Sequence, residues 1–165
     1  MLKLISPLLL LLILCGSITY AQPGRDMAKE KAIWAELETL APQRVEDFKA
    51  ATEAMDAQDY EKAIGLFQKV HQEAPKFDPT LRRLGGSLVA TGKTEDGFRF
   101  LRQALAIRRS PENLISLAES LAFPAAGKEG TRQQKQEAYA LIREARVSAR
   151  QDLAGKACRR QGWRN

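Results

Sequence analysis

One residue pattern occurs twice between Phe48 and Ile107, with a period of 34 residues. Each copy has small residues on one helix, a short break, and then large apolar residues at helical spacing on a second helix. The positions that repeat are Ala51 and Gly85, Ala63 and Gly97, Phe67 and Leu101, and Val70 and Ala104. Small residues let two helices approach closely and large ones fill the core between them. The period therefore predicts an all-α array of stacked helical hairpins.

Helix start signals predict the same phasing as the repeat. A start is marked where a side chain that can cap the first free N–H groups is followed by proline or by carboxylates in the first turn. The starts are marked by Asp59, by Asp78-Pro79, by Thr94 with Glu95 and Asp96, and by Ser110-Pro111. These signals are independent of the period, so they support the same set of helices.

The chain resembles the tetratricopeptide repeat family, and two segments carry the resemblance: AATEAMDAQDYEKAIGLFQKVHQEAPKFDP and GGSLVATGKTEDGFRFLRQALAI. The first ends in the proline-terminated form typical of that motif. The resemblance covers Val45 to about Arg109 well and the remainder of the mature chain loosely. Gly97 stands where the family usually has alanine. Glycine lowers the helix propensity by about 1 kcal/mol there, but it keeps the side chain small at the point where two helices cross. The resemblance implies a solenoid of about three repeats with an additional N-terminal helix.

The predicted organisation follows from these marks. A targeting segment is expected at 1–21, a spacer and capping helix at 22–44, and two repeats at 45–77 and 78–110. A divergent third repeat is expected at 111–153, with an expanded loop at 123–130, and a basic tail at 154–165. Counting back by one period places Ile33 and Trp34 opposite Phe67, so the first helix reads as half of an incomplete repeat, with Trp34 as a cap. Thr131 and Gln134 fit a capping box that opens the last helix.

The first 21 residues have the form of an export signal. Lys3 provides the positive start, an apolar run follows to Leu14, and Thr19-Tyr20-Ala21 offers small residues for cleavage. The run is short for a membrane span. We expect export to the periplasm or the exterior with cleavage after Ala21. The alternatives are a lipoprotein anchor at Cys15, disfavoured because Leu14 is bulky, and an uncleaved membrane anchor.

The cysteine content determines whether a disulfide can stabilise the fold. If Cys15 is removed with the signal, Cys158 is the only cysteine in the mature chain, so no internal disulfide is available and the fold depends on packing. Cys158 precedes two arginines, which favour the thiolate. An incidental thiol is the simplest reading, with redox chemistry or intermolecular pairing as the alternatives.

No enzymatic constellation is recognisable. His71 is the only histidine, without a second ligand at metal spacing, and the serines have no base in any predictable arrangement. Gly85-Gly86 lies within a helical pattern and is not a phosphate loop. We therefore expect a protein that is not an enzyme and has no metal or cofactor.

The resemblance instead implies binding by shape, because the first helix of each hairpin in this family lines a groove that holds a peptide or a helix of a partner. Carried over by motif position, the groove residues are Phe48, Thr52 and Met55 from the first repeat, Arg82, Arg83, Gly86 and Val89 from the second, and Ile115 and Glu119 from the third. Arg82 and Arg83 could pair with a carboxylate. Phe48 and Thr52 replace the Lys and Asn of the family's chaperone-tail clamp, so that ligand is not expected. The leading hypothesis is an exported adaptor that holds another envelope protein.

Charge is distributed unevenly along the chain. Residues 22–60 hold 5 Lys/Arg against 9 Asp/Glu, whereas residues 128–165 hold 10 against 4. Arg143, Arg146 and Arg150 share one helical face, and the positive field continues through Lys156, Arg159, Arg160 and Arg164, with Trp163 as the one aromatic residue. This pattern is that of a solvated face or of a patch that attracts an acidic protein, phospholipid head groups or a charged envelope polymer. Nucleic acid is not expected, given the export signal and the absence of interleaved aromatic residues.

Overall fold

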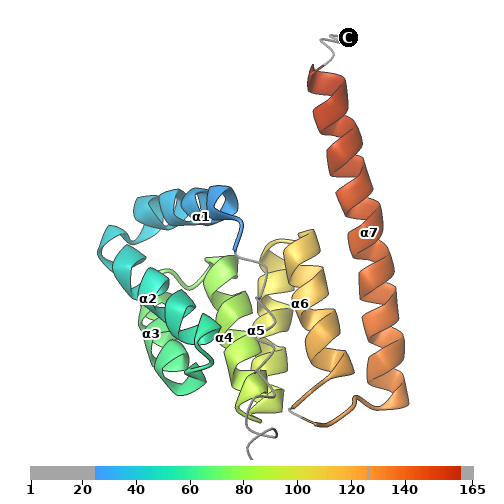
Figure 1. Cartoon of the computed structure of the whole chain (residues 1–165), viewed down its shortest axis with the longest axis horizontal. Helices are drawn as coiled ribbons and strands as arrows, with labels where there is room; N and C mark the ends of the chain where they lie inside the picture. Colours follow the sequence, from blue (N-terminus) through green and yellow to red (C-terminus); the bar gives the residue numbers. More distant parts are fainter. Residues whose placement is uncertain (1–24, 126, 161–165) are drawn as a thin grey trace, which may run out of the picture.

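The computed structural model describes residues 25–125 and 127–160, and helices account for most of them (Figure 1). Their bounds are α1 Met27–Leu40, α2 Val45–Asp56, α3 Tyr60–Glu73, α4 Asp78–Ala90, α5 Thr94–Ile107, α6 Pro111–Ala122 and α7 Arg132–Arg160, with a 3₁₀ turn at Pro42–Arg44 between α1 and α2. No β-strand occurs in the described ranges. The prediction of an all-α fold is confirmed.

The helices pair as three hairpins, α2 with α3, α4 with α5, and α6 with α7. The first helices of the hairpins, α2, α4 and α6, form one layer of the array, in which α4 contacts both α2 and α6. The second helices, α3, α5 and α7, form the other layer. This is the stacked arrangement that the repeat predicts.

Two glycines allow α4 and α5 to cross with their backbones close together. A Cβ placed on Gly85 would lie 2.9 Å from the carbonyl oxygen of Gly97, and one on Gly97 would lie 2.8 Å from that of Gly85. In the first hairpin the equivalent positions are Ala51 and Ala63, both fully buried. The predicted role of the small residues is thus confirmed.

The core consists of two clusters. In the first, Phe48 packs edge-on against Phe67 and Phe77, with ring centroids 5.6 and 5.7 Å away. The second joins α4 through α7 and contains Val89, Phe98, Leu101, Leu105, Leu114, Leu117, Ala118, Leu121, Ala138, Leu141 and Ala145. The fold therefore rests on side-chain packing along the whole array.

Three of the predicted helix starts are capped as expected. Asp59 accepts a hydrogen bond from the amide of Lys62, and Ser110 accepts one from the amide of Asn113, each 3.3 Å long. Thr131 and Gln134 form the predicted capping box: the Gln134 amide donates to the Thr131 hydroxyl (3.2 Å), and the Thr131 amide donates to the Gln134 side chain (2.8 Å).

The caps expected at Asp78 and Thr94 are wrong. Each is the first residue of its helix, and each side chain bonds elsewhere. The Asp78 carboxylate accepts from the amide side chain of Asn113 (2.8 Å), and the Thr94 hydroxyl donates to the carbonyl of Pro124 (2.9 Å). Both side chains therefore connect neighbouring repeats, and local sequence cannot predict these contacts because their partners are distant along the chain.

The two ends of the array differ from expectation. Figure 1 shows α1 lying crosswise to α4, so it is not the second half of an incomplete hairpin. Its apolar residues Ile33, Trp34 and Leu37 cover the first core cluster. At the other end, α7 continues beyond residue 153 to Arg160 and projects past α6. Between 132 and 160 there is no proline and a single glycine, so nothing ends the helix earlier.

Several predictions concern positions outside the described residues. They are the signal at 1–21 with Cys15, the residues Trp163 and Arg164, and the side chains of Lys156, Cys158, Arg159 and Arg160. Within the described part of the chain, no helix has the length and apolar character needed to cross a membrane.

Candidate functional site

The layer of α2, α4 and α6, here called the groove face, carries two hollows. The first, here called the loop pocket, has a volume of about 910 Å³ and lies at the C-terminal ends of α4 and α6 beside the expanded loop. Its lining comprises Gln58, Tyr60, Gly86, Val89, Ala90, Glu119, Ser120, Phe123, Ala125, Gly127, Lys128 and Glu129. Both apolar and charged side chains line it, as suits a segment of polypeptide.

Gly86 and Phe123 define the shape of the loop pocket. A Cβ on Gly86 would meet no atom within 4 Å, so the helix backbone is open to the hollow there. Phe123, at the end of α6, is 65% exposed and forms an apolar part of the lining. The loop is held in place by Thr94 and by Gly130, whose amide donates to the carbonyl of Ala122 (2.8 Å).

The second hollow, here called the α1 pocket, has a volume of about 430 Å³ and lies between α1 and the N-terminal ends of α4 and α6. Most of its lining is ionisable: Arg25, Asp26, Lys29, Glu30, Glu36, Asp78, Arg82, Arg83, Arg108 and Glu112. The helix that closes it, α1, belongs to the same chain.

Arg83 is the centre of the contacts between α1 and the groove face. Its guanidinium donates to the Glu30 carboxylate (2.5 Å) and to the Thr52 hydroxyl (2.5 Å), and it lies over the ring of Phe48, 4.7 Å from the centroid. Arg83 and Glu30 are both buried. Burial lowers the pKa of Arg83 to about 10, against the opposing effect of the Glu30 carboxylate. A buried cation of this kind requires an anion beside it.

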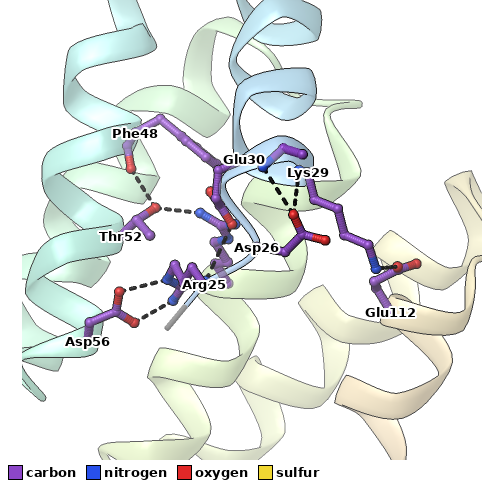
Figure 2. A network of polar contacts seen from close by, with 10 residues as sticks. Arg25, Asp26, Lys29, Glu30, Phe48, Thr52, Asp56 and Glu112 are labelled. Carbon is purple, nitrogen blue, oxygen red and sulfur yellow. Dashed lines mark hydrogen bonds and ion pairs between the residues drawn. The ribbon is translucent and has the colours of Figure 1, made fainter. Parts of the chain in front are cut away.

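Further ion pairs link the N-terminal segment to all three hairpins (Figure 2). Arg25 pairs with Asp56 of α2 at 2.5 Å, and Lys29 pairs with Glu112 of α6 at 3.2 Å. The hydrogen bond to Asp56 raises the pKa of Arg25 above its ordinary value. Glu36 pairs with Arg108, which follows α5. Because these pairs are more exposed than Arg83 and Glu30, each contributes little to stability.

Arg82 lies beside Arg83 in the α1 pocket but is half-buried and has no ion pair or hydrogen bond with the described residues. Burial lowers its pKa, and Glu112 and Asp78 oppose that effect from a distance. Arg82 is thus a cation available for a carboxylate.

The predicted groove residues fall into two groups. Met55 and Arg82 are partly exposed, but Phe48, Thr52, Arg83 and Val89 are buried. The expectation that these four side chains lie open on the groove is corrected. Phe48 and Val89 pack in the two core clusters, Arg83 pairs with Glu30 of α1, and the Thr52 hydroxyl accepts from Arg83. Of the less central predictions, Gly86 and Glu119 line the loop pocket and Ile115 is exposed. Whether this face binds a partner stays a prediction.

Glu30 and Phe123 were not anticipated from the sequence. A signal for Glu30 existed, because it shares the helical stripe of Ile33, Trp34 and Leu37 at spacings of 3, 4 and 7 residues. A carboxylate on the apolar face of a helix needs a buried partner. Phe123 had no comparable signal, since its exposure depends on how the loop folds.

The exposed basic residues of α7 form a separate candidate site. Arg143, Arg146 and Arg150 are exposed, and none has an ion-pair partner within the described part of the chain. Arg159 and Arg160 extend the same helix. The neighbouring Glu144 is occupied by Arg109.

Within residues 25–125 and 127–160, no three His, Cys, Asp or Glu side chains gather in a way that could hold a metal ion. His71 lies edge-on to Phe100, with ring centroids 5.5 Å apart, and burial lowers its pKa. Its surroundings are those of a packed side chain.

Comparison with known proteins identifies the array. Residues 54–120 match the family model described as tetratricopeptide repeat, which spans the end of α2 through most of α6. The comparisons with curated proteins and with solved structures gave no significant match. Repeats of this family generally mediate contacts between proteins and are typically non-enzymatic scaffolds. The stacked hairpins, the small residues at their crossings and this match all support a tetratricopeptide repeat array over residues 54–120.

Proposed function

We propose that the chain is an exported adaptor that holds another protein on its groove face. The observation that carries the proposal is the loop pocket, an open hollow of about 910 Å³ bordered by α4, α6 and the loop after α6. Its size suits a short peptide segment. Binding, rather than catalysis, is the activity that its side chains support.

Gly86 offers a direct test, because a longer side chain there would fill the pocket without a clash at its Cβ. We expect Gly86→Gln to abolish capture of the partner from a cell-envelope extract at high salt. Gly65→Gln is the matched control, since Gly65 is also a helical glycine whose Cβ would meet no atom within 4 Å, but it lies on α3. Equal capture by both variants would contradict the placement of the site.

Export is part of the proposal and rests on the pattern of residues 1–21. The test is fractionation of cells that produce the full chain, followed by N-terminal sequencing. We expect a processed form that begins at Gln22 outside the cytoplasm. An N-terminal block at Cys15 would identify a lipoprotein, and an intact chain in the cytoplasm would contradict export.

A second candidate function uses α7. Attraction to an anionic surface is favoured by three exposed arginines without an ion-pair partner among the described residues, Arg143, Arg146 and Arg150. We expect the full chain to sediment with vesicles that contain anionic phospholipid at low salt and not at high salt. Substituting the three arginines with glutamine should abolish that sedimentation and leave capture through the loop pocket intact.

A further inference from the structure

The N-terminal helix occupies part of the surface on which repeats of this kind hold their partners. It lies crosswise to α4, and its contacts reach α2, α4 and α6 (Figures 1 and 2). The helix α1 thus packs on the array in the manner of a bound ligand, although it belongs to the same chain.

The contact at Arg83 selects a carboxylate. The guanidinium is enclosed by Glu30, Thr52 and the ring of Phe48, so a neutral group in place of Glu30 would leave a buried positive charge. Yet the pair is incompletely satisfied: Glu30 Oε2 and Arg83 Nε are buried without a hydrogen-bond partner among the described residues. The pair therefore specifies which helix binds more than it stabilises the bound state.

The apolar contacts supply a second requirement. Leu37 is fully buried, and Ile33 and Trp34 pack against the same core cluster. Counted from Glu30, they lie at i+3, i+4 and i+7, the spacing of one helical face. A helix that seats here must present one carboxylate and this apolar stripe.

The remaining ties of α1 are weaker. Lys29 with Glu112 and Glu36 with Arg108 are exposed pairs, and exposed pairs add little to a docked state. The half-buried Arg82 supplies an additional positive charge beside the same surface. The charge of the groove face thus favours an acidic helix.

We infer that the groove face around Arg83 is a binding site for an acidic amphipathic helix of a partner protein, and that α1 is its built-in occupant, which the partner displaces. The inference goes beyond the proposed binding at the loop pocket, because it adds a second site and gives the class of its partner: a helix with a carboxylate at i and large apolar residues at i+3, i+4 and i+7. Recognition follows the helix-in-groove mode.

A synthetic peptide of residues 25–41, labelled with a fluorophore, is a suitable probe because it reproduces α1. Its affinity is measured by anisotropy against the full chain and against the full chain with Glu30→Gln. The substitution weakens the internal helix and leaves Arg83 in place, so we expect the peptide to bind the variant at least about tenfold more tightly than the unaltered chain. Glu38→Gln is the matched control, since Glu38 is an exposed carboxylate of α1 without an ion pair among the described residues.

The peptide itself supplies the converse test. A peptide in which the position of Glu30 carries glutamine should bind the Glu30→Gln chain at least about tenfold more weakly than the unaltered peptide. Equal affinity of the unaltered peptide for both chains, or equal affinity of both peptides for the variant, would overturn the inference. If the Glu30→Gln variant without peptide had the mass of a dimer in solution, a second copy of the chain would be the occupant. That result would overturn the inference that a separate partner protein binds here.

Hydrogen exchange on the unaltered chain gives a measurement that does not depend on the folding of a variant. Displacement requires that the amides of α1 exchange faster than those of α4. Protection of α1 equal to that of α4 would overturn the inference. The Gly86→Gln capture experiment concerns the loop pocket and not α1, so the adaptor proposal and this inference can fail separately.

Discussion

Gly85 and Gly97 face one another where α4 crosses α5, so closely that a Cβ on either would lie within 3 Å of the carbonyl oxygen of the other. Both contacts involve backbone, which cannot move away as a side chain can. A Cβ on Gly85 would also lie 2.8 Å from Leu101 Cγ. The next residue, Gly86, faces the loop pocket and has no such neighbour.

Adjacent glycines in α4 should therefore respond to alanine in opposite directions. We expect Gly86→Ala to stabilise the fold by about 0.5–1 kcal/mol, because alanine favours the helix and the space is free. Gly85→Ala should destabilise it by about 1–3 kcal/mol, because the two helices must separate. Urea unfolding followed by circular dichroism measures both, and a stabilising Gly85→Ala would contradict the crossing described above.

Breaking the buried ion pair should be costly, whereas replacing it should not. Arg83→Met leaves the Glu30 carboxylate buried without its cation, and we expect a loss of about 3 kcal/mol in the free energy of unfolding. The double variant Glu30→Leu with Arg83→Met should recover most of that loss. Thermal unfolding of the single and double variants tests this coupling.

An exposed pair of the same helix provides the comparison. Glu112→Gln removes the partner of Lys29, and we expect a change of less than about 1 kcal/mol because water already solvates both groups. A loss as large as that of Arg83→Met would show that α1 is held by its exposed pairs and not by Arg83.

Asn113 joins three parts of the array through one amide group. Its Nδ2 lies 2.8 Å from the Asp78 carboxylate, 3.2 Å from the Ala104 carbonyl and 2.8 Å from the Arg108 carbonyl, and its two N–H groups are shared among these three acceptors. We expect Asn113→Ala to destabilise the fold by about 1–3 kcal/mol, because buried acceptors lose their donor. Ser110→Ala, which removes only the cap of the same helix, should cost about 1 kcal/mol in the same unfolding assay.

The stability of the chain should decrease as the pH falls through the ordinary range of histidine. Burial lowers the pKa of His71 in the folded chain below the ordinary histidine value of 6.5. Below pH 6.5 the unfolded chain takes up the proton first, so protonation favours unfolding down to the lower folded pKa. His71 is the only histidine, and His71→Gln should therefore flatten the dependence of the unfolding midpoint between pH 7.5 and about 5. If the pH dependence of the unfolding midpoint were the same in His71→Gln, groups other than His71 would be its cause.

The sequence predicts the array well because its signals are local. The period places the crossings at Gly85 and Gly97, and caps such as Ser110 mark helix starts within a few residues. A stripe of apolar residues shows that α1 has a buried face, but not which surface buries it. The covering of Phe48 and Arg83 therefore escaped prediction. Asp78 escaped for the same reason, since its partner Asn113 lies 35 residues away.

The reach of α1 also bears on how the molecule comes apart. In a linear array each repeat contacts only its neighbours, so the ends can fray while the middle stays folded. Here one helix contacts α4 through Glu30 and α6 through Lys29, and covers α2 with its apolar face. The buried contacts of this helix therefore tie the first two hairpins together, and the first cannot separate from the second while α1 is docked. Once α1 opens, these two hairpins become separate units, whereas the last hairpin, tied to α1 by the exposed Lys29–Glu112 pair, frays independently of it.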